Sequence, residues 1–275
     1  MNDPAHFSMD LAHGKLHYLQ KGDGPLLLLI HGSLCDYRYW RWQIDALAQQ
    51  YRVLAPSLRG YWPEALQTED PGFTIAQQTD DLLTLIDTLS PDAPVVILGH
   101  SRGAQIAVEL TIKAPERVAG LIAADPGFRF SDEPETLLFH AETLEELRAG
   151  NLDRALAGFV NAVNGQDIWR HMVSWFKTMV KDNAYTLLSQ AREVNKAIDP
   201  EAVSKIACPL LLISGANSPE RYTSRAQRLA KLIPQTLHTT IENASHGMNL
   251  ANPKAFNHAV LAFLDQYVAT HSKTD

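Results

Sequence analysis

The chain has 275 residues, of which 45% are hydrophobic, and a formal net charge of −7. This length is enough for one large core, so we expect one globular unit with an insertion. The negative charge argues against nucleic acid and anionic membranes as main partners. The start of the chain lacks the pattern of a signal peptide, and the longest apolar run, near residues 26–30, is too short to span a bilayer.

The two cysteines, Cys35 and Cys208, lack CxxC spacing and have no metal-ligand partners near them in the sequence. We therefore expect free thiols in a reducing, cytoplasmic compartment and no metal site. The sequence contains no phosphate loop and no dinucleotide fingerprint, so we expect no cofactor. It indicates no particular oligomeric state.

Apolar runs and turn residues predict a hairpin followed by strands that alternate with helices. The hairpin is expected from residues 7–11 and 16–20, and a helix with an apolar stripe from residues 75–89. The remaining strands are predicted at residues 26–30, 52–55, 95–98, 118–124, 209–214 and 236–241. This order predicts a mostly parallel, eight-stranded sheet flanked by helices, with its active site at the carboxyl ends of the strands.

The segment Gly99-His100-Ser101-Arg102-Gly103 has the Gly-x-Ser-x-Gly spacing of a nucleophile elbow. It follows the apolar run of residues 95–98 and precedes small residues typical of the start of a helix. In such a turn the serine backbone is strained, and the glycines permit close packing. We therefore predict Ser101 as a nucleophile and His100 as a packing neighbour at the substrate pocket. The alternative is an ordinary glycine-rich turn.

Residues 131–199 show helical patterns and no convincing strand, so we expect a helical cap there and a core of residues 1–130 and 200–275. Two cap helices are predicted at residues 142–150 and 152–163. Apolar residues then recur at three- and four-residue spacing, namely Trp169, Met172, Val173, Phe176, Met179 and Val180. We expect Trp169, Met172, Phe176 or Trp175 to roof an apolar pocket, although this stripe would also serve to pack the cap onto the core.

His246 lies on the short polar loop of residues 242–247, between the last predicted strand and a helix that begins near Asn252-Pro253. A histidine in this place, after a serine and an acid, has the chain order of a Ser…Asp/Glu…His triad. We therefore predict His246 as the general base.

The chain resembles the α/β-hydrolase superfamily over nearly its full length. The matching segments are His31-Gly32, Arg59-Gly60, Gly99–Gly103 and Ser245-His246-Gly247. The resemblance implies cleavage of an ester or related acyl bond through a serine acyl-enzyme. It also implies an oxyanion hole made by the backbone N–H groups of Ser33, or Leu34, and Arg102, with Leu34 at the substrate.

The position of the acid departs from the commonest pattern of the superfamily. Many relatives carry an aspartate after strand seven, where this chain has Ser218, and a hydroxyl cannot stabilise an imidazolium as a carboxylate does. Asp125, at the end of the sixth predicted strand, is the first candidate, because some members of the superfamily place the acid there. Its alternative role is to cap the following loop. Glu220 is the second candidate.

These features favour a carboxylesterase-like enzyme that acts on a small apolar or aromatic substrate. Two other classes stay open. Some proteins that resemble this superfamily carry out cofactor-free oxygen chemistry on heteroaromatic rings, with a histidine base, an acid after the sixth strand and little contribution from the serine. The third possibility is a ligand sensor on the same scaffold, which would bind tightly without turnover.

Overall fold

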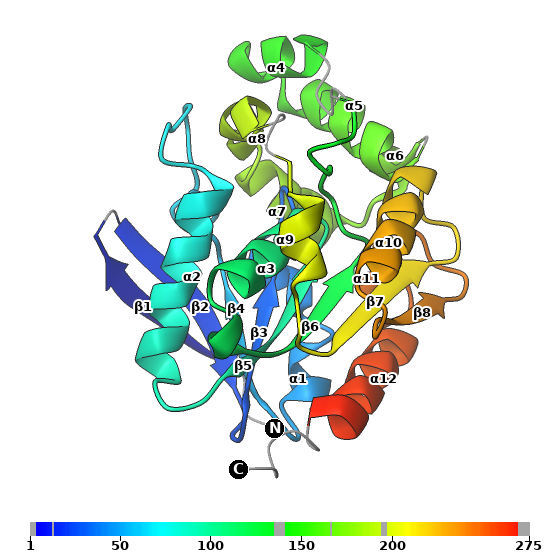
Figure 1. Cartoon of the computed structure of the whole chain (residues 1–275). Helices are drawn as coiled ribbons and strands as arrows, with labels where there is room; N and C mark the ends of the chain where they lie inside the picture. The colour runs from blue at the N-terminus through cyan, green and yellow to red at the C-terminus, as the bar shows by residue number, and fades with distance from the viewer. Residues whose placement is uncertain (1–3, 13, 135–140, 166, 194–196, 269–275) are drawn as a thin grey trace.

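The computed structural model describes residues 4–12, 14–134, 141–165, 167–193 and 197–268. Eight strands form one sheet in the order β1-β2-β4-β3-β5-β6-β7-β8 (Figure 1). Their bounds are Ala5–Leu11, Gly14–Lys21, Leu26–Ile30, Arg52–Pro56, Val95–His100, Val118–Ala124, Leu210–Gly215 and Leu237–Ile241 for β1 to β8. Strand β2 pairs antiparallel with β1 and β4, and the later neighbours are parallel. The predicted mostly parallel, eight-stranded sheet is confirmed.

Helices cover both faces of this sheet, and the residues of β3 divide between the two faces. Leu26, Leu28 and Ile30 join one apolar cluster, whereas Leu27 and Leu29 join the other, as the two-residue period of a strand requires. Helices α2 (Ile75–Leu89), α3 (Arg102–Lys113) and α10 (Glu220–Leu232) pack on the first face, and α1 (Ile44–Leu47) and α12 (Pro253–Phe263) on the second. This double burial explains why the central strands are continuous apolar runs.

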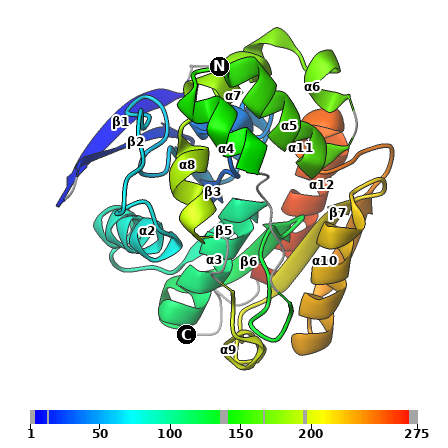
Figure 2. The same ribbon diagram turned by 90° about the horizontal axis from the view of Figure 1, so that it is seen from above.

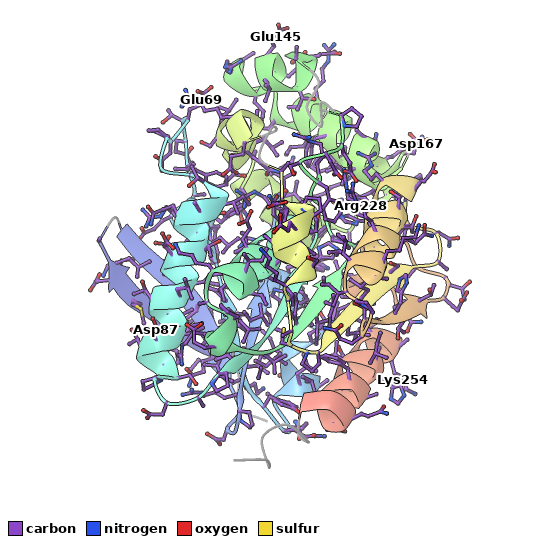
Figure 3. The ribbon with its side chains drawn as sticks, viewed as in Figure 1. Glu69, Asp87, Glu145, Asp167, Arg228 and Lys254 are labelled. Atoms are coloured by element: carbon purple, nitrogen blue, oxygen red, sulfur yellow. The ribbon has the colours of Figure 1, made fainter. Side chains whose placement is uncertain are left out.

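Short helical turns lie between or after these elements. They are η1 (Tyr37–Trp40), η2 (Pro115–Arg117), α11 (Met248–Ala251) and η4 (Leu264–Val268). Charged side chains such as Asp87, Glu145 and Lys254 point outward from the ribbon (Figure 3). Among the helices that the structure describes, none has both the length and the hydropathy needed to cross a bilayer.

The described residues between β6 and β7 form helices. These are α4 (Ala141–Arg148), α5 (Leu152–Asn164), α6 (Ile168–His171), α7 (Ser174–Asp182), α8 (Thr186–Gln190), η3 (Ala191–Glu193) and α9 (Pro200–Ser204). Figures 1 and 2 show α4, α5 and α8 over the end of the sheet at which the parallel strands finish. An apolar cluster that includes Leu147, Leu156, Phe159, Val180 and Leu187 holds these helices together.

The apolar stripe from Trp169 to Val180 is divided between two helices, α6 and α7. Helix α6 ends at His171, and Met172 and Val173 are extended, with ψ angles of 133° and 150°. The chain turns helical again at Ser174. Residues on the two sides of this break therefore no longer share one face, because a common face requires uninterrupted helical periodicity.

Helix α3 lies so close to β3 that only glycine fits at residue 103. A Cβ atom on Gly103 would lie 2.3 Å from the carbonyl oxygen of Ile30 and 2.5 Å from that of His31. Both oxygens belong to the backbone, so neither can move without shifting the strand or the loop that follows it.

We expect Gly103→Ala to lower the free energy of unfolding by about 2 kcal/mol, because the added methyl group overpacks the contact between helix and strand. Gly158→Ala, inside α5, is the matched control, since a Cβ there meets only the Thr143 hydroxyl at 3.3 Å. Urea unfolding of the two variants measures both effects. Equal stability of the two variants would contradict this account of Gly103.

Candidate active site

Ser101 lies between β5 and α3 in a strained conformation, with φ 55° and ψ −120°. Positive φ is unfavourable for a residue with a Cβ atom, so surrounding contacts must hold it. The Ser101 N–H donates to the Ala124 carbonyl, and the Gly127 N–H donates to the Ser101 carbonyl, each over 3.0 Å. Gly99 makes the turn possible, because a Cβ atom there would lie 2.3 Å from the Gly103 carbonyl oxygen. The serine is thus fixed at the carboxyl end of the sheet.

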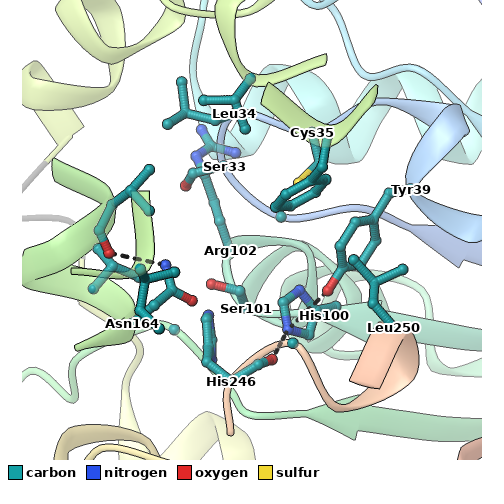
Figure 4. Close-up of a pocket in the computed structure, with 18 of the residues that line it drawn as sticks. Ser33, Leu34, Cys35, Tyr39, His100, Ser101, Arg102, Asn164, His246 and Leu250 are labelled. Carbon is teal, nitrogen blue, oxygen red and sulfur yellow. Dashed lines mark hydrogen bonds between the residues drawn. The ribbon is translucent and has the colours of Figure 1, made fainter. Parts of the chain in front are cut away.

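Ser101 forms part of the wall of a cavity of about 410 Å³ (Figure 4). Other predicted site residues in this wall are Ser33, Leu34, His100, Arg102, Met172, Phe176 and His246. Much of the remaining wall is apolar and comes from α5, α6 and α7, for example Phe159, Val163, Ile168 and Val180. The cavity therefore lies between the end of the sheet and the helices that follow β6.

Trp169 is not in the cavity wall, contrary to the prediction. Its residue surface is 8% exposed, and its ring packs inside the cluster formed by α5, α7 and α8. Trp175 is also absent from the wall, and the guanidinium of Arg41 lies 4.6 Å from its ring centre. Trp175 precedes Phe176 directly on α7, so the two side chains point about 100° apart and only Phe176 reaches the cavity. Trp169 follows Ile168 on α6 in the same way, and Ile168 is the one in the wall.

His246 contacts Asp125, which lies directly after β6. The distance from His246 Nδ1 to Asp125 Oδ2 is 3.1 Å, and both side chains are buried. A proton on Nδ1 donates to the carboxylate, which leaves the lone pair of the ring on Nε2. Figure 4 shows this ring beside the Ser101 hydroxyl. The structure therefore brings Ser101, His246 and Asp125 to one place.

Ser218 also contacts Asp125. Its hydroxyl donates to the same Asp125 oxygen over 2.5 Å, so the residue at the commoner acid position hydrogen-bonds with the carboxylate that stands one strand away. Glu220, the second candidate for the acid, is exposed at the start of α10. No contact between Glu220 and His246 is present among the residues described.

Burial sets the protonation of these groups. It raises the pKa of Asp125 to about 6, and the hydrogen bond from Ser218 partly opposes this shift. It lowers the pKa of His246 to about 3, and the positive charge of Arg221 lowers that pKa further. At neutral pH the carboxylate is therefore ionised and the imidazole is neutral, which is the state that a general base needs.

The space beside the serine hydroxyl is bounded by backbone. A Cβ atom on Gly127 would lie 3.0 Å from both Ser101 Oγ and the backbone nitrogen of Arg102, so glycine leaves this corner open. The Arg102 side chain is held by Gln78, whose Oε1 accepts over 2.5 Å, and by an ion pair with Glu193. Ser33 lies in the same cavity wall. The Arg102 backbone nitrogen therefore borders the same corner as the Ser101 hydroxyl.

Sequence reasoning missed two aromatic neighbours of the histidines. The ring of Tyr222, on α10, stacks on that of His246 with centroids 3.8 Å apart and planes 15° apart. Tyr39 packs against His100, whose Nε2–H donates to the His246 carbonyl over 2.7 Å. No motif marks either tyrosine, because only the folded chain brings α10 and η1 against the histidine loop.

No cluster of three or more His, Cys, Asp or Glu side chains in the described part of the chain has the arrangement of a metal site. Cys35 is a buried free thiol in the cavity wall, and burial raises its pKa well above the usual value. The thiol is therefore protonated at neutral pH and is a poor nucleophile.

Residues 27–259 match the alpha/beta hydrolase family. The chain is 26% identical over 255 residues to the (E)-2-((N-methylformamido)methylene)succinate hydrolase of Acinetobacter baylyi. The aligned region covers 90% of this chain and 94% of that protein. Its fold is similar to the enol-lactonase of Burkholderia xenovorans LB400, with a TM-score of 0.80, 22% identity and coverage of 94% and 100% of the two chains. It is also similar to carboxylesterase CesB of Bacillus subtilis, with a TM-score of 0.75, 21% identity and coverage of 96% and 92%. The chain belongs to the alpha/beta hydrolase family and is a hydrolase enzyme of that family.

Proposed function

We propose that this enzyme is a serine hydrolase that cleaves a small carboxylic ester or a related acyl bond. The observation that carries the proposal is one arrangement of three side chains. Ser101 stands on a strained turn, His246 faces the same cavity, and the buried carboxylate of Asp125 lies 3.1 Å from His246. This arrangement has the chain order of a nucleophile, an orienting acid and a base, and the hydrogen bond between the base and the acid.

In the first half of the reaction, Ser101 Oγ attacks the carbonyl carbon while His246 Nε2 takes the hydroxyl proton. Asp125 keeps the other ring proton on Nδ1 and stabilises the imidazolium that forms. The backbone N–H groups of Ser33 and Arg102 donate to the developing oxyanion, and each such donor lowers the barrier by about 3 kcal/mol. The tetrahedral intermediate then expels the alcohol, which takes the proton from His246, and the acyl group remains on Ser101.

In the second half, His246 removes a proton from water, and the resulting hydroxide attacks the acyl-enzyme. Collapse of the second tetrahedral intermediate releases the acid and returns the proton to Ser101. The largely apolar wall, which includes Leu34, Met172 and Phe176, supports a small substrate with an apolar or aromatic part. The similar protein of Acinetobacter baylyi is named as a hydrolase, which supports hydrolysis over other chemistry.

Cofactor-free oxygen chemistry is the second candidate. The observation that favours it is the placement of Asp125 after β6, in hydrogen-bond contact with His246. In that reaction His246 would deprotonate a heteroaromatic substrate, and Ser101 would contribute little. Oxygen consumption that survives Ser101→Ala would identify it.

We expect a fluorophosphonate to label Ser101 rapidly, because it captures a serine activated by a neighbouring base. Ser101→Ala and His246→Ala should each lower kcat for a small ester by about 10⁴-fold or more. Mass spectrometry of the labelled peptide and steady-state kinetics measure these effects. Absence of labelling in the folded protein would overturn the proposed nucleophile.

Asp125→Asn should lower kcat by about 10⁴-fold, because the amide no longer favours the required tautomer or the imidazolium. Glu220→Gln is the matched control and should retain normal turnover. The double variant Asp125→Asn/Ser218→Asp should recover part of the lost activity, since the new carboxylate lies at the neighbouring strand end. Normal turnover in Asp125→Asn together with loss of turnover in Glu220→Gln would assign the acid to Glu220 instead of Asp125.

The pH profile should have an acid limb set by the Asp125–His246 pair. Because burial raises the pKa of Asp125 to about 6, kcat/KM should fall about tenfold per pH unit below that value, as the carboxylate becomes protonated. Ser218→Ala removes a hydrogen bond that favours the ionised form, so the acid limb should move to higher pH. A profile that is unchanged in Ser218→Ala would contradict this positioning role of Ser218.

A further inference from the structure

Three arginines on α10 differ in their partners. Arg221 donates to the carbonyl oxygen of Ala162, and Arg228 forms ion pairs with Asp132 and Glu133. Arg225, between them, is partly buried and lies in the wall of the cavity that contains Ser101. Among the described residues, no carboxylate lies within ion-pair distance of its guanidinium.

The surroundings of Arg225 offer it no free counter-charge. The described residues of the cavity wall include no Asp and no Glu. Burial lowers the pKa of Arg225, and the negative charge of Glu133 partly opposes this shift. The Glu133 carboxylate, however, pairs with Arg228 at 2.7 Å and accepts from the Phe130 N–H at 3.1 Å. The other arginine of the wall, Arg102, is already paired with Glu193.

An arginine keeps its charge even when it is partly buried, so it requires a partner inside a largely apolar cavity. Its planar guanidinium matches a carboxylate through two parallel hydrogen bonds. The overall charge of −7 repels anions at long range, so any preference for an anion must come from this local group. Arg225 is placed to bind a ligand near the candidate base, because Tyr222 lies one helical turn before it and stacks on His246.

We propose that Arg225 binds a carboxylate of the substrate, so that the enzyme prefers an acyl compound with a second, free carboxylate over its neutral counterpart. This inference rests on the proposed acyl-transfer function and adds the substrate class to it. The apolar wall would contact the carbon chain of the substrate, and Ser101 Oγ would attack its acyl carbon. Arg225 would bind the carboxylate at the other end of the substrate.

The test compares two substrates that differ only in charge, the 4-nitrophenyl half ester of glutaric acid and its neutral terminal amide. The wild type should have a higher kcat/KM for the half ester, and Arg225→Gln should lower the ratio of the two kcat/KM values by at least about tenfold. Arg225→Lys should give a ratio between those of the wild type and Arg225→Gln, because lysine keeps the positive charge but lacks the planar guanidinium that forms two parallel hydrogen bonds. Arg154→Gln is the matched control, since Arg154 is exposed on α5 and should leave the ratio unchanged.

Binding separates this inference from the proposed function. Calorimetry on the Ser101→Ala protein should detect glutarate but not glutaramide, and the double variant Ser101→Ala/Arg225→Gln should lose the glutarate signal. The binding result is expected even if the enzyme hydrolyses neither ester. Absence of hydrolysis would count against the acyl-transfer function and not against carboxylate binding by Arg225. A substrate ratio within twofold of wild type in a folded Arg225→Gln protein, or equal binding of glutarate by both Ser101→Ala proteins, would overturn the role of Arg225.

Discussion

The geometry of the candidate site depends on one buried carboxylate. Asp125 has no exposed surface, and a charge in that position is tolerated only when hydrogen bonds replace the lost water. Its Oδ2 accepts from His246 and Ser218, and its backbone N–H donates to the Ile213 carbonyl over 2.9 Å. The residue therefore joins the end of β6, the end of β7 and the loop after β8, so the orientation of the histidine depends on the pairing of β6 with β7.

The position of this carboxylate follows from the geometry of a parallel sheet. Strands β6 and β7 are neighbours, and hydrogen-bonded strands lie about 4.8 Å apart. An acid at the end of either strand can thus reach the same histidine. With the acid after β6, the position after β7 is filled by Ser218, whose hydroxyl supports the carboxylate. In the sequence, Ser218 looks like the loss of the acid after β7. In the fold, its hydroxyl donates a hydrogen bond to the acid after β6, Asp125.

The cavity combines segments that are distant in the sequence. The end of the sheet supplies Ser101 and His246, the helices after β6 supply an apolar wall, and α10 supplies Tyr222 and Arg225. The strained turn at Ser101 is stabilised by backbone contacts, whereas the substrate wall is formed by side chains of short helices. On the proposed function, the reacting groups would be held by the end of the sheet and the substrate by the helices packed over it.

Local patterns in the sequence predict part of this fold and of its candidate site. Strand positions follow from short apolar runs, and α2 follows from its helical stripe. The turn at Ser101 follows from the Gly-x-Ser-x-Gly spacing, in which Gly99 avoids a clash with the Gly103 carbonyl four residues later. The sequence also identified Asp125 and Glu220 as candidates for the acid. Packing in the folded chain sets which of these carboxylates contacts His246, where the Trp169 stripe breaks, and that Tyr222 and Arg225 line the cavity. These outcomes depend on packing between segments far apart in the chain, and no local periodicity carries that information.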